Sequence, residues 1–151
     1  MGMEIERKFL IKDIPENLES YDFHIIEQAY LTLEPVIRIR RQDDDYYMTY
    51  KGKGLMSHEE YNLPLTKEAY YTLKSKADGN IITKKRYLIP YGPYTIELDF
   101  FEEPFKPLIL AEVEFPTEKE AESFSPPEWF DIDVTDNREY YNSNMSRKVF
   151  S

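Results

Sequence analysis

The fold is decided by the stretch Met3-Glu4-Ile5-Glu6-Arg7-Lys8-Phe9-Leu10-Ile11. Its even positions carry the charged residues Glu4, Glu6 and Lys8, whereas most of its odd positions are apolar. A period of two places alternate side chains on opposite faces of a strand. The stretch therefore predicts a β-strand with one charged face and one largely apolar face.

Further segments of the same kind follow along the chain, separated by residues that favour turns. Besides residues 3–11, strands are predicted at residues 22–33, 36–42, 46–51, 58–65, 81–89, 94–101 and 108–115. Turns are predicted at Asp43-Asp44-Asp45, Gly52-Lys53-Gly54 and Asp78-Gly79-Asn80. Short connections favour antiparallel neighbours, and closure into a barrel removes the free edges of a sheet. The predicted fold class is β with some helix: an eight-stranded antiparallel closed β-barrel, or tunnel.

A few short helices are predicted to pack outside this barrel. They are expected at residues 13–18, 66–75, 117–124 and 136–150. Thr66 is a favourable N-cap residue for the second of these helices. Thr117 and Glu120 have the spacing of a capping box at the start of the third. Amphipathic helices need an apolar surface to cover. If they cover the outside of the barrel, the charged face of each strand must point inward.

Length and composition narrow the classes of function. The 151 residues fit one domain, residues 1–151, and the lack of cysteine excludes disulfides and zinc–thiolate sites. A net charge of −10 argues against general binding of nucleic acid or anionic membranes. No stretch approaches the ~18 apolar residues of a membrane span. A cytoplasmic protein is expected, with any metal ion held by oxygen atoms or by one of the two histidines.

Charged residues spaced by two recur on most of the predicted strands. The set is Glu4, Glu6, Lys8, Arg38, Arg40, Lys51, Glu60, Lys84, Arg86, Glu97, Asp99, Glu112 and Glu114. For any one pair, exposure to solvent is the simpler interpretation, because charged side chains are mostly exposed. As a whole set inside a barrel, they require a wet tunnel with a charged ligand, since isolated buried charges are costly. Carboxylates suit Mg²⁺ or Mn²⁺, and Lys and Arg suit a polyanion, so the set favours phosphoryl transfer.

The order of these motifs resembles a known family. Glu4-Ile5-Glu6-Arg7-Lys8 is similar to the E-x-E-x-K motif of the CYTH superfamily, also called triphosphate tunnel metalloenzymes. The resemblance spans the chain through Tyr30, Ile37-Arg38-Ile39-Arg40, Lys51, Glu60-Tyr61, Lys84-Lys85-Arg86-Tyr87, Glu97-Leu98-Asp99 and Glu112-Val113-Glu114-Phe115. It implies a tunnel that binds the triphosphate moiety of a substrate together with a divalent metal ion.

The resemblance also implies roles for individual residues. Metal ligands are expected at Glu4, Glu6 and Glu114, and Glu112 is similar to the acid that orients the attacking water. Phosphate is expected to contact Lys8, Arg38, Arg40, Lys51, Lys84 and Arg86. Glu60, Glu97 and Asp99 are further tunnel acids, of which Glu60 is expected to orient a neighbouring cation.

Four further positions depart from the family pattern or leave alternatives open. Tyr30 resembles a tyrosine that pairs with the first-strand lysine in some short members, which would make it catalytic together with Lys8 and Glu112; the alternative is a packed core tyrosine. Arg138 lies where short members carry a basic residue that could close over the tunnel mouth. Asn62 stands where many members have a second acid, and His58 on the same face is either a structural residue or a support for a metal ligand.

The leading functional hypothesis is hydrolysis of inorganic tripolyphosphate to pyrophosphate and phosphate, as in the compact bacterial branch of the family. Nucleoside triphosphates are possible further substrates. A class IV-type adenylyl cyclase and a thiamine triphosphatase are the enzymatic alternatives. A module that binds polyphosphate without turnover is the main non-enzymatic alternative, although its function would not need so many carboxylates. The sequence does not distinguish a monomer from a homodimer.

Overall fold

The computed structural model describes residues 2–52 and 57–150. Within these residues the strands are β1 (Gly2–Ile11), β2 (Phe23–Leu33), β3 (Val36–Gln42), β4 (Asp45–Lys51), β5 (Ser57–Pro64), β6 (Asp78–Tyr91), β7 (Tyr94–Phe101), β8 (Ile109–Glu114) and β9 (Phe130–Asp133). They form one antiparallel sheet in the order β5-β4-β3-β2-β6-β7-β8-β1-β9. The chain is therefore mostly antiparallel sheet, as the alternating pattern predicts.

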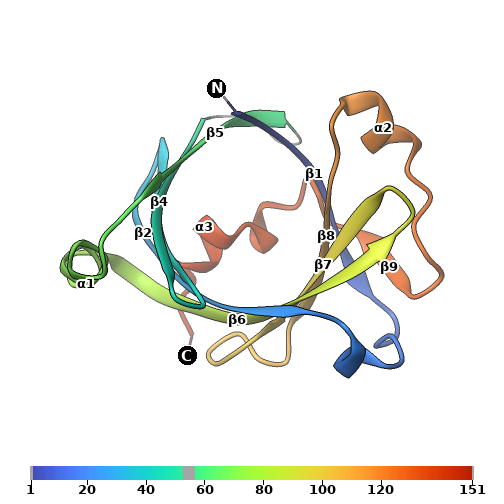
Figure 1. Cartoon of the computed structure of the whole chain (residues 1–151), viewed down its shortest axis with the longest axis horizontal. Coiled ribbons are helices and arrows are strands. Elements are labelled where there is room, and N and C mark those ends of the chain that lie inside the picture. Colours follow the sequence, from blue (N-terminus) through green and yellow to red (C-terminus); the bar gives the residue numbers. More distant parts are fainter. Residues whose placement is uncertain (1, 53–56, 151) are drawn as a thin grey trace.

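The first strand, β1, lies next to β8 near one end of this order and also pairs with β5 at the other end. The first half of β1 pairs with β5, with Gly2 opposite Glu60, and its second half pairs with β8, with Glu6 opposite Glu114. The sheet consequently curls around a central space, which Figure 1 shows in a view along it. Each strand thus has one face toward this space and one face away from it.

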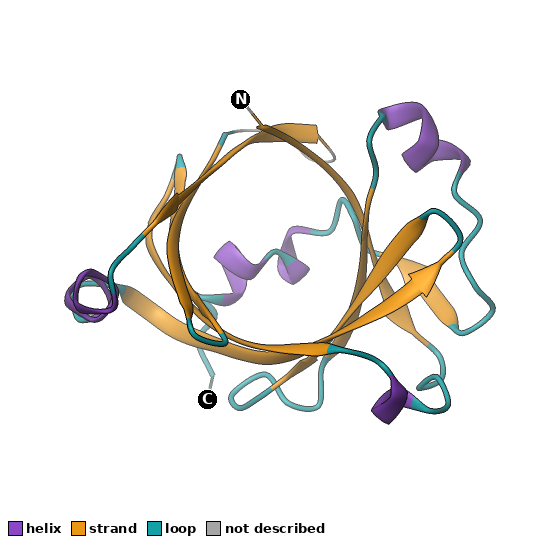
Figure 2. Ribbon diagram, in the orientation of Figure 1, coloured by secondary structure: helices purple, strands orange, loops and turns teal. Residues whose placement is uncertain are grey.

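Two helices cover the outside of the curled sheet, and one further segment crosses its middle. Helix α1 (Lys67–Lys74) lies against β3 and β4, and α2 (Glu118–Ser123) lies beside β1 (Figure 2). The short helix α3 (Asn142–Met145) and the 3₁₀ turn η2 (Arg138–Tyr140) lie across the central space in this view. A second 3₁₀ turn, η1 (Leu18–Ser20), precedes β2. Among the described residues, none of the helices has the length and apolar character needed to cross a membrane.

The two outer helices begin as their cap residues predict. The hydroxyl of Thr66 accepts a hydrogen bond from the backbone N–H of Ala69 at 3.1 Å. At α2, the hydroxyl of Thr117 accepts one from the N–H of Glu120, also at 3.1 Å. Each cap satisfies a backbone donor that the first helical turn leaves free.

Apolar side chains fill the outer face of the sheet beneath these helices. One cluster lies between α2 and the sheet and includes Phe9, Leu98, Val113 and Phe124. A smaller cluster beneath α1 contains Ala29, Ile39 and Tyr70. A third cluster, around Tyr30, Ile82, Phe101, Leu110 and Met145, lies instead on the inner face, where the C-terminal segment meets the sheet. The first two clusters agree with the prediction that apolar faces point outward, whereas the third shows that one part of the inner face is also apolar.

Several boundaries differ from the prediction. Strand β9 is absent from the predicted strands, and residues 78–80, predicted as a turn, instead form the start of β6. Gly79 has φ +81°, and a Cβ there would lie 2.1 Å from the carbonyl oxygen of Ser146, so this glycine permits the close approach of the C-terminal segment. The turn expected at residues 13–18 is instead the 3₁₀ turn that starts at Leu18. The turn predicted at residues 52–54 falls largely outside the described residues.

The single helix predicted at residues 136–150 is wrong. Only the short elements η2 and α3 form in this described segment. Its backbone carbonyls bind groups of the sheet: Tyr140 O accepts from Lys8, and Met145 O and Lys148 O accept from the Asn80 amide. Because a regular helix needs its carbonyl groups for its own hydrogen bonds, docking on the sheet and a long helix compete.

Candidate active site

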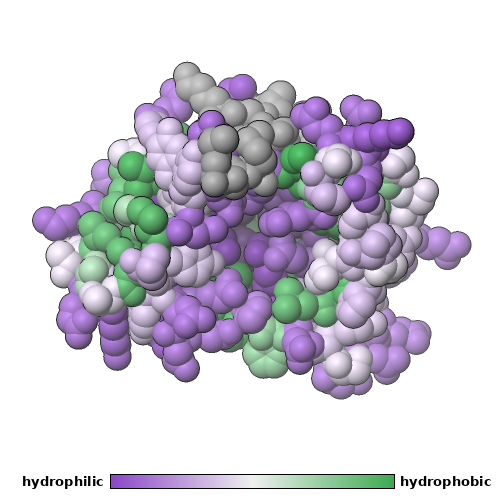
Figure 3. Space-filling view, turned by 45° about the horizontal axis from the view of Figure 1, so that its top comes forward, coloured by the Kyte–Doolittle hydropathy of each residue, from purple (hydrophilic) through white to green (hydrophobic). Residues whose placement is uncertain are grey.

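A polar cavity of about 310 Å³ lies inside the curled sheet. Figure 3 shows hydrophilic side chains gathered around this hollow. Residues predicted for the site that line it are Glu4, Glu6, Lys8, Tyr30, Arg38, Arg40, Lys51, Glu60, Arg86, Glu97, Glu112 and Glu114. Strands from around the whole sheet therefore bring most of the predicted residues to one place.

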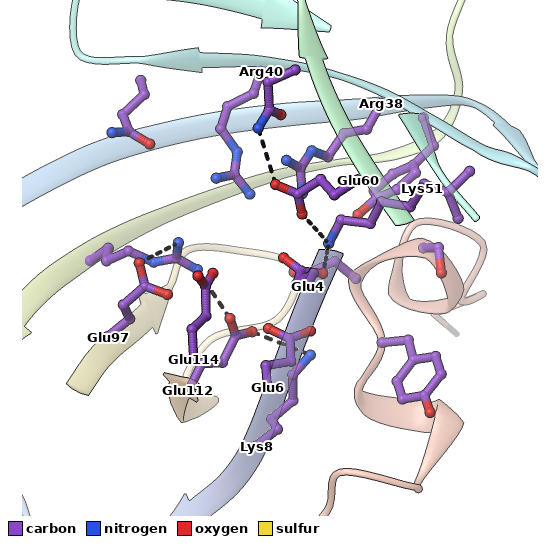
Figure 4. A pocket seen from close by; sticks show the side chains of 18 of the residues that line it. Glu4, Glu6, Lys8, Arg38, Arg40, Lys51, Glu60, Glu97, Glu112 and Glu114 are labelled. Atoms are coloured by element: carbon purple, nitrogen blue, oxygen red, sulfur yellow. Dashed lines mark hydrogen bonds and ion pairs between the residues drawn. The ribbon is translucent and has the colours of Figure 1, made fainter. Parts of the chain in front are cut away.

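Strand β1 supplies three of these residues from one face. Glu4 is 8% exposed and Lys8 is 6% exposed, and both point into the cavity with Glu6 between them (Figure 4). Phe9, on the opposite face, is 2% exposed and packs in the cluster beneath α2. The alternation in the sequence thus separates a charged interior from an apolar exterior along a single strand.

Three carboxylates could hold a metal ion. Glu4, Glu6 and Glu114 each offer one oxygen atom, and these atoms lie within 4.8 Å of one another. Burial, together with the charges of Glu112 and Glu4, raises the pKa of Glu6 to about 7. Burial and neighbouring carboxylates likewise raise the pKa of Glu114 to about 8. The all-oxygen donors of this cluster fit a hard divalent cation such as Mg²⁺ or Mn²⁺.

Glu112 is held between two cations. Its carboxylate oxygens lie 3.3 Å from Lys8 Nζ and 3.5 Å from Arg86 Nη2. Although burial raises the pKa of Glu112, the charges of Lys8 and Arg86 hold it well below its usual range. Glu112 is consequently ionised near neutral pH, which makes it a hydrogen-bond acceptor but a weak base.

Lys8 is fixed from two sides. Besides Glu112, its ammonium group donates to the backbone carbonyl of Tyr140 at 2.9 Å. Burial lowers the pKa of Lys8, but the charges of Glu112 and Glu6 outweigh this effect and raise it overall. A positively charged ammonium group therefore stands beside the carboxylate cluster.

Lys84 and Asp99 lie behind the cavity lining. Asp99 is fully buried and accepts both a bidentate pair from Arg86, at 2.7 and 2.8 Å, and an ion pair from Lys84 at 2.8 Å. Burial lowers the pKa of Lys84 to about 8, despite the charge of Asp99. The structure thus places Lys84 next to Arg86 but not among the lining residues. Its direct contact is with Asp99, which also orients Arg86.

On the other side of the cavity, Lys51 joins two acids. Its ammonium group lies 3.0 Å from Glu4 and 3.8 Å from Glu60. Asn62 donates to Glu60 at 3.0 Å, and burial together with Glu4 raises the pKa of Glu60. Glu60 thus lies within ion-pair distance of Lys51, a neighbouring cation of the kind that it is expected to orient. The side chain of His58 lies outside the described residues.

Arg38 and Arg40 are held by uncharged groups. Arg38 Nη2 donates to the hydroxyl of Thr49 at 3.1 Å, and Arg40 donates twice to the amide oxygen of Gln28, at 2.9 and 2.5 Å. Within residues 2–52 and 57–150, neither guanidinium group forms an ion pair with a described carboxylate. This wall of the cavity therefore keeps its positive charge.

Tyr30 and Arg138 are placed differently from each other. Tyr30 lines the cavity, and its hydroxyl accepts from Gln28 at 3.4 Å, whereas the hydrogen bonds of the described residues do not join it to Lys8. Arg138 is exposed and is not among the described residues that line the cavity. The structure brings Tyr30 to the site but leaves Arg138 outside it.

Sequence reasoning missed several lining residues. They are Val36, Gln42, Tyr47, Gly52, Thr135, Tyr141, Asn142 and Ser143. Tyr47 could have been found, since it lies on the same alternation of β4 as Lys51. The C-terminal residues carry no comparable signal, because their segment has no regular period and reaches the cavity only through its docking on the sheet.

Comparison with known protein families agrees with this geometry. The family model described as CYTH domain matches residues 2–146. The chain belongs to the CYTH family. The resemblance inferred from Glu4-Ile5-Glu6-Arg7-Lys8 and the later motifs is thereby confirmed. The cavity described above is therefore the cavity of a CYTH domain.

Individual CYTH proteins are similar over nearly the whole chain. An inorganic triphosphatase of Nitrosomonas europaea is 35% identical over 153 residues, which cover 97% of this chain and 98% of that protein. An inorganic triphosphatase of Acetivibrio thermocellus is 30% identical, with 99% and 97% covered. The crystal structure of the inorganic triphosphatase NE1496 has a TM-score of 0.73 at 32% identity, covering 99% of this chain and 97% of that one.

Proposed function

We propose that this CYTH protein hydrolyses inorganic tripolyphosphate to pyrophosphate and phosphate with the help of a divalent metal ion. The observation that carries the proposal is the division of one cavity into a carboxylate cluster and a cationic wall. A metal-bound polyanion needs both, because the metal requires oxygen ligands and the phosphates require positive charge. The inorganic triphosphatases to which the chain is similar support the choice of substrate.

The carboxylate cluster fits the metal part of this proposal. Glu4, Glu6 and Glu114 would hold Mg²⁺ or Mn²⁺, whose charge would offset the burial and the mutual repulsion that raise the pKa of Glu6 and Glu114. When bound, the ion would supply positive charge to the phosphate oxygens as the bond to the leaving group breaks. These carboxylates must lose their protons before they bind a cation.

The cationic residues would bind and orient the phosphates. Those that line the cavity are Lys8, Arg38, Arg40, Lys51 and Arg86. In this proposal Lys84 acts through Asp99, which it shares with Arg86. Arg138 would have to move from its exposed position to reach a substrate.

Glu112 would orient the attacking water. Its carboxylate lies 3.3 Å from Lys8, on the same strand as Glu114, so it would accept a hydrogen bond from a water molecule next to the carboxylate cluster and hold that water toward a bound phosphate. The low pKa favours orientation of the water over removal of its proton. Tyr30 lines the same cavity and would contribute a hydroxyl donor to the bound anion.

The architecture proposed for this activity is a closed tunnel of β1 to β8 formed by one domain, residues 1–151. The pairing of β1 with both β5 and β8 supports closure. The lack of cysteine suits a reducing compartment, so the cytoplasm is the proposed location.

Product analysis tests the reaction. The purified protein is incubated with tripolyphosphate, ATP or thiamine triphosphate, each with Mg²⁺, Mn²⁺ or a chelator, and phosphate, pyrophosphate and cyclic AMP are quantified. The expected result is metal-dependent release of equal amounts of pyrophosphate and phosphate from tripolyphosphate. Cyclic AMP with pyrophosphate from ATP would establish the cyclase alternative, and binding without turnover of any substrate would establish the binding module.

A further inference from the structure

The cavity cations fall into two groups by the partners that hold them. Lys8, Lys51 and Arg86 each form an ion pair with a carboxylate, at 3.3, 3.0 and 2.7 Å respectively. Arg38 and Arg40 are only 5% and 7% exposed, yet no carboxylate of the described residues lies within ion-pair distance of either. Two buried guanidinium charges next to each other are unfavourable unless an anion joins them.

Gln28 holds Arg40 as a carboxylate would, but without a charge. Its side chain is fully buried, and its single amide oxygen accepts from both Nε and Nη2 of Arg40, at 2.9 and 2.5 Å. The other end of the amide donates to Tyr30 at 3.4 Å. The guanidinium plane is therefore fixed while its charge remains available.

Thr49 likewise holds Arg38 through an uncharged group. The buried hydroxyl of Thr49 accepts from Arg38 Nη2 at 3.1 Å and donates to the amide oxygen of Asn62 at 2.6 Å. Arg38 Nε is buried and has no hydrogen-bond partner among the described residues. A buried donor without a partner is rare in folded proteins, so Arg38 Nε is a donor available to an anion in the cavity.

The register of the sheet places these two uncharged partners, Gln28 and Thr49, which are called anchors below. Gln28 of β2 lies directly opposite Arg40 of β3, and Arg38 of β3 lies directly opposite Thr49 of β4. Directly opposite residues of antiparallel strands point to the same face, so each anchor reaches its arginine across one strand spacing. Burial and the nearby charges of Arg38 and Arg86 lower the pKa of Arg40, which agrees with a wall of positive potential.

We propose that Gln28 and Thr49 are positioning residues that orient Arg40 and Arg38 toward a phosphate group while leaving both positive charges uncompensated. The inference rests on the proposed function, since it concerns how the same cavity binds a condensed phosphate. An acid at position 28 would orient Arg40 equally well but would cancel its charge. The lack of charge on Gln28 is thus the property that we expect to raise affinity for the anion. A negative charge at this position should weaken anion binding without destabilising the fold.

The variant Gln28→Glu tests this separation, because it keeps the size of the side chain and adds one negative charge beside Arg40. The KM for tripolyphosphate is expected to rise about 10- to 100-fold, the range expected when a charged hydrogen bond to a phosphate is cancelled. The midpoint of thermal unfolding is expected to stay equal or increase. Thr72→Glu, on the exposed side of α1, is the matched control for added charge and should leave KM unchanged.

A purely structural role for Gln28 predicts the opposite pattern. In that case Gln28→Glu would keep the wild-type KM, and this result would overturn the proposal. If Gln28→Glu does not fold, Gln28→Met decides: it removes the acceptor at similar volume, and an unchanged KM in a folded Gln28→Met protein would overturn the proposal equally. Calorimetric titration of the metal-free proteins with tripolyphosphate keeps the test independent of turnover. An inactive wild type that binds tripolyphosphate more tightly than Gln28→Glu would refute the hydrolase but support the anchor.

Discussion

The two faces of β1 are buried to a similar extent by opposite means. On the outer face, Phe9 is 2% exposed because aromatic and aliphatic neighbours cover it. On the inner face, Glu4 at 8% and Lys8 at 6% are enclosed among other charges. Packing on the outer face stabilises the fold, whereas the gathered carboxylates of the inner face oppose it. Along β1, therefore, the packing that stabilises the fold and the groups of the candidate site lie on opposite faces.

The largest effect is expected from the inner face. Glu6→Gln should lower metal-dependent hydrolysis of tripolyphosphate by about 10²- to 10³-fold, the range seen when one group that stabilises a transition state is removed. The same variant should be more stable than the wild type in the absence of metal, because it removes one of three repelling carboxylates. Initial rates and thermal unfolding of the same preparations measure both effects. If Glu6→Gln unfolds at a lower temperature than the wild type and keeps its activity, the inner face of β1 contributes to stability and not to hydrolysis.

The outer face should show the reverse response. Phe9→Ala should lower the free energy of unfolding by about 3–5 kcal/mol, because it leaves a cavity among packed rings. Urea unfolding of the metal-free protein gives the value. Phe9→Leu is the graded control, with a smaller loss. If Phe9→Ala unfolds like the wild type, the outer cluster does not carry the stability of the fold.

The pH dependence of stability should also differ between the faces. The folded-state pKa values of Glu6, about 7, and Glu114, about 8, lie above the usual 4.5, so the folded state holds these protons more tightly than the unfolded state. Their contribution to stability is complete below about pH 4.5 and is lost as the pH rises through 7 to 8. In the presence of a chelator, the unfolding midpoint should therefore fall over this range. Glu6→Gln should flatten the slope, and a midpoint that rises from pH 6 to 8 would contradict the prediction.

The smallest effect is expected at Glu27, on the outer face next to α1. Its carboxylate pairs with Lys74 at 2.9 Å and accepts from Tyr70 at 2.8 Å, and although burial raises its pKa, these contacts lower it overall. This contribution is present above the unfolded pKa near 4.5 and is lost on acidification. Glu27→Gln should cost about 1 kcal/mol or less near neutral pH, since solvent screens the pair. Unfolding curves at pH 7 and pH 4 measure the difference, with Glu68→Gln as the exposed control on α1.

Much of the fold could be predicted because the relevant signals are local. The alternation in residues 3–11, the turn residues of the β3–β4 hairpin, and the caps Thr66 and Thr117 depend only on neighbours in sequence. Strand β9 and the C-terminal segment could not be predicted, because their conformation depends on docking against distant residues such as Asn80.

The candidate site divides in the same way. The sequence by itself determined which charged residues share a face of each strand, and so which of them could act together. The predicted outer helices also indicated that this face points inward. The partners of the individual charges, such as Asp99 for Arg86 and Gln28 for Arg40, became known only from the folded structure. The physical reason is that alternation follows from backbone geometry within a strand, whereas the partner of a charge depends on the register between strands.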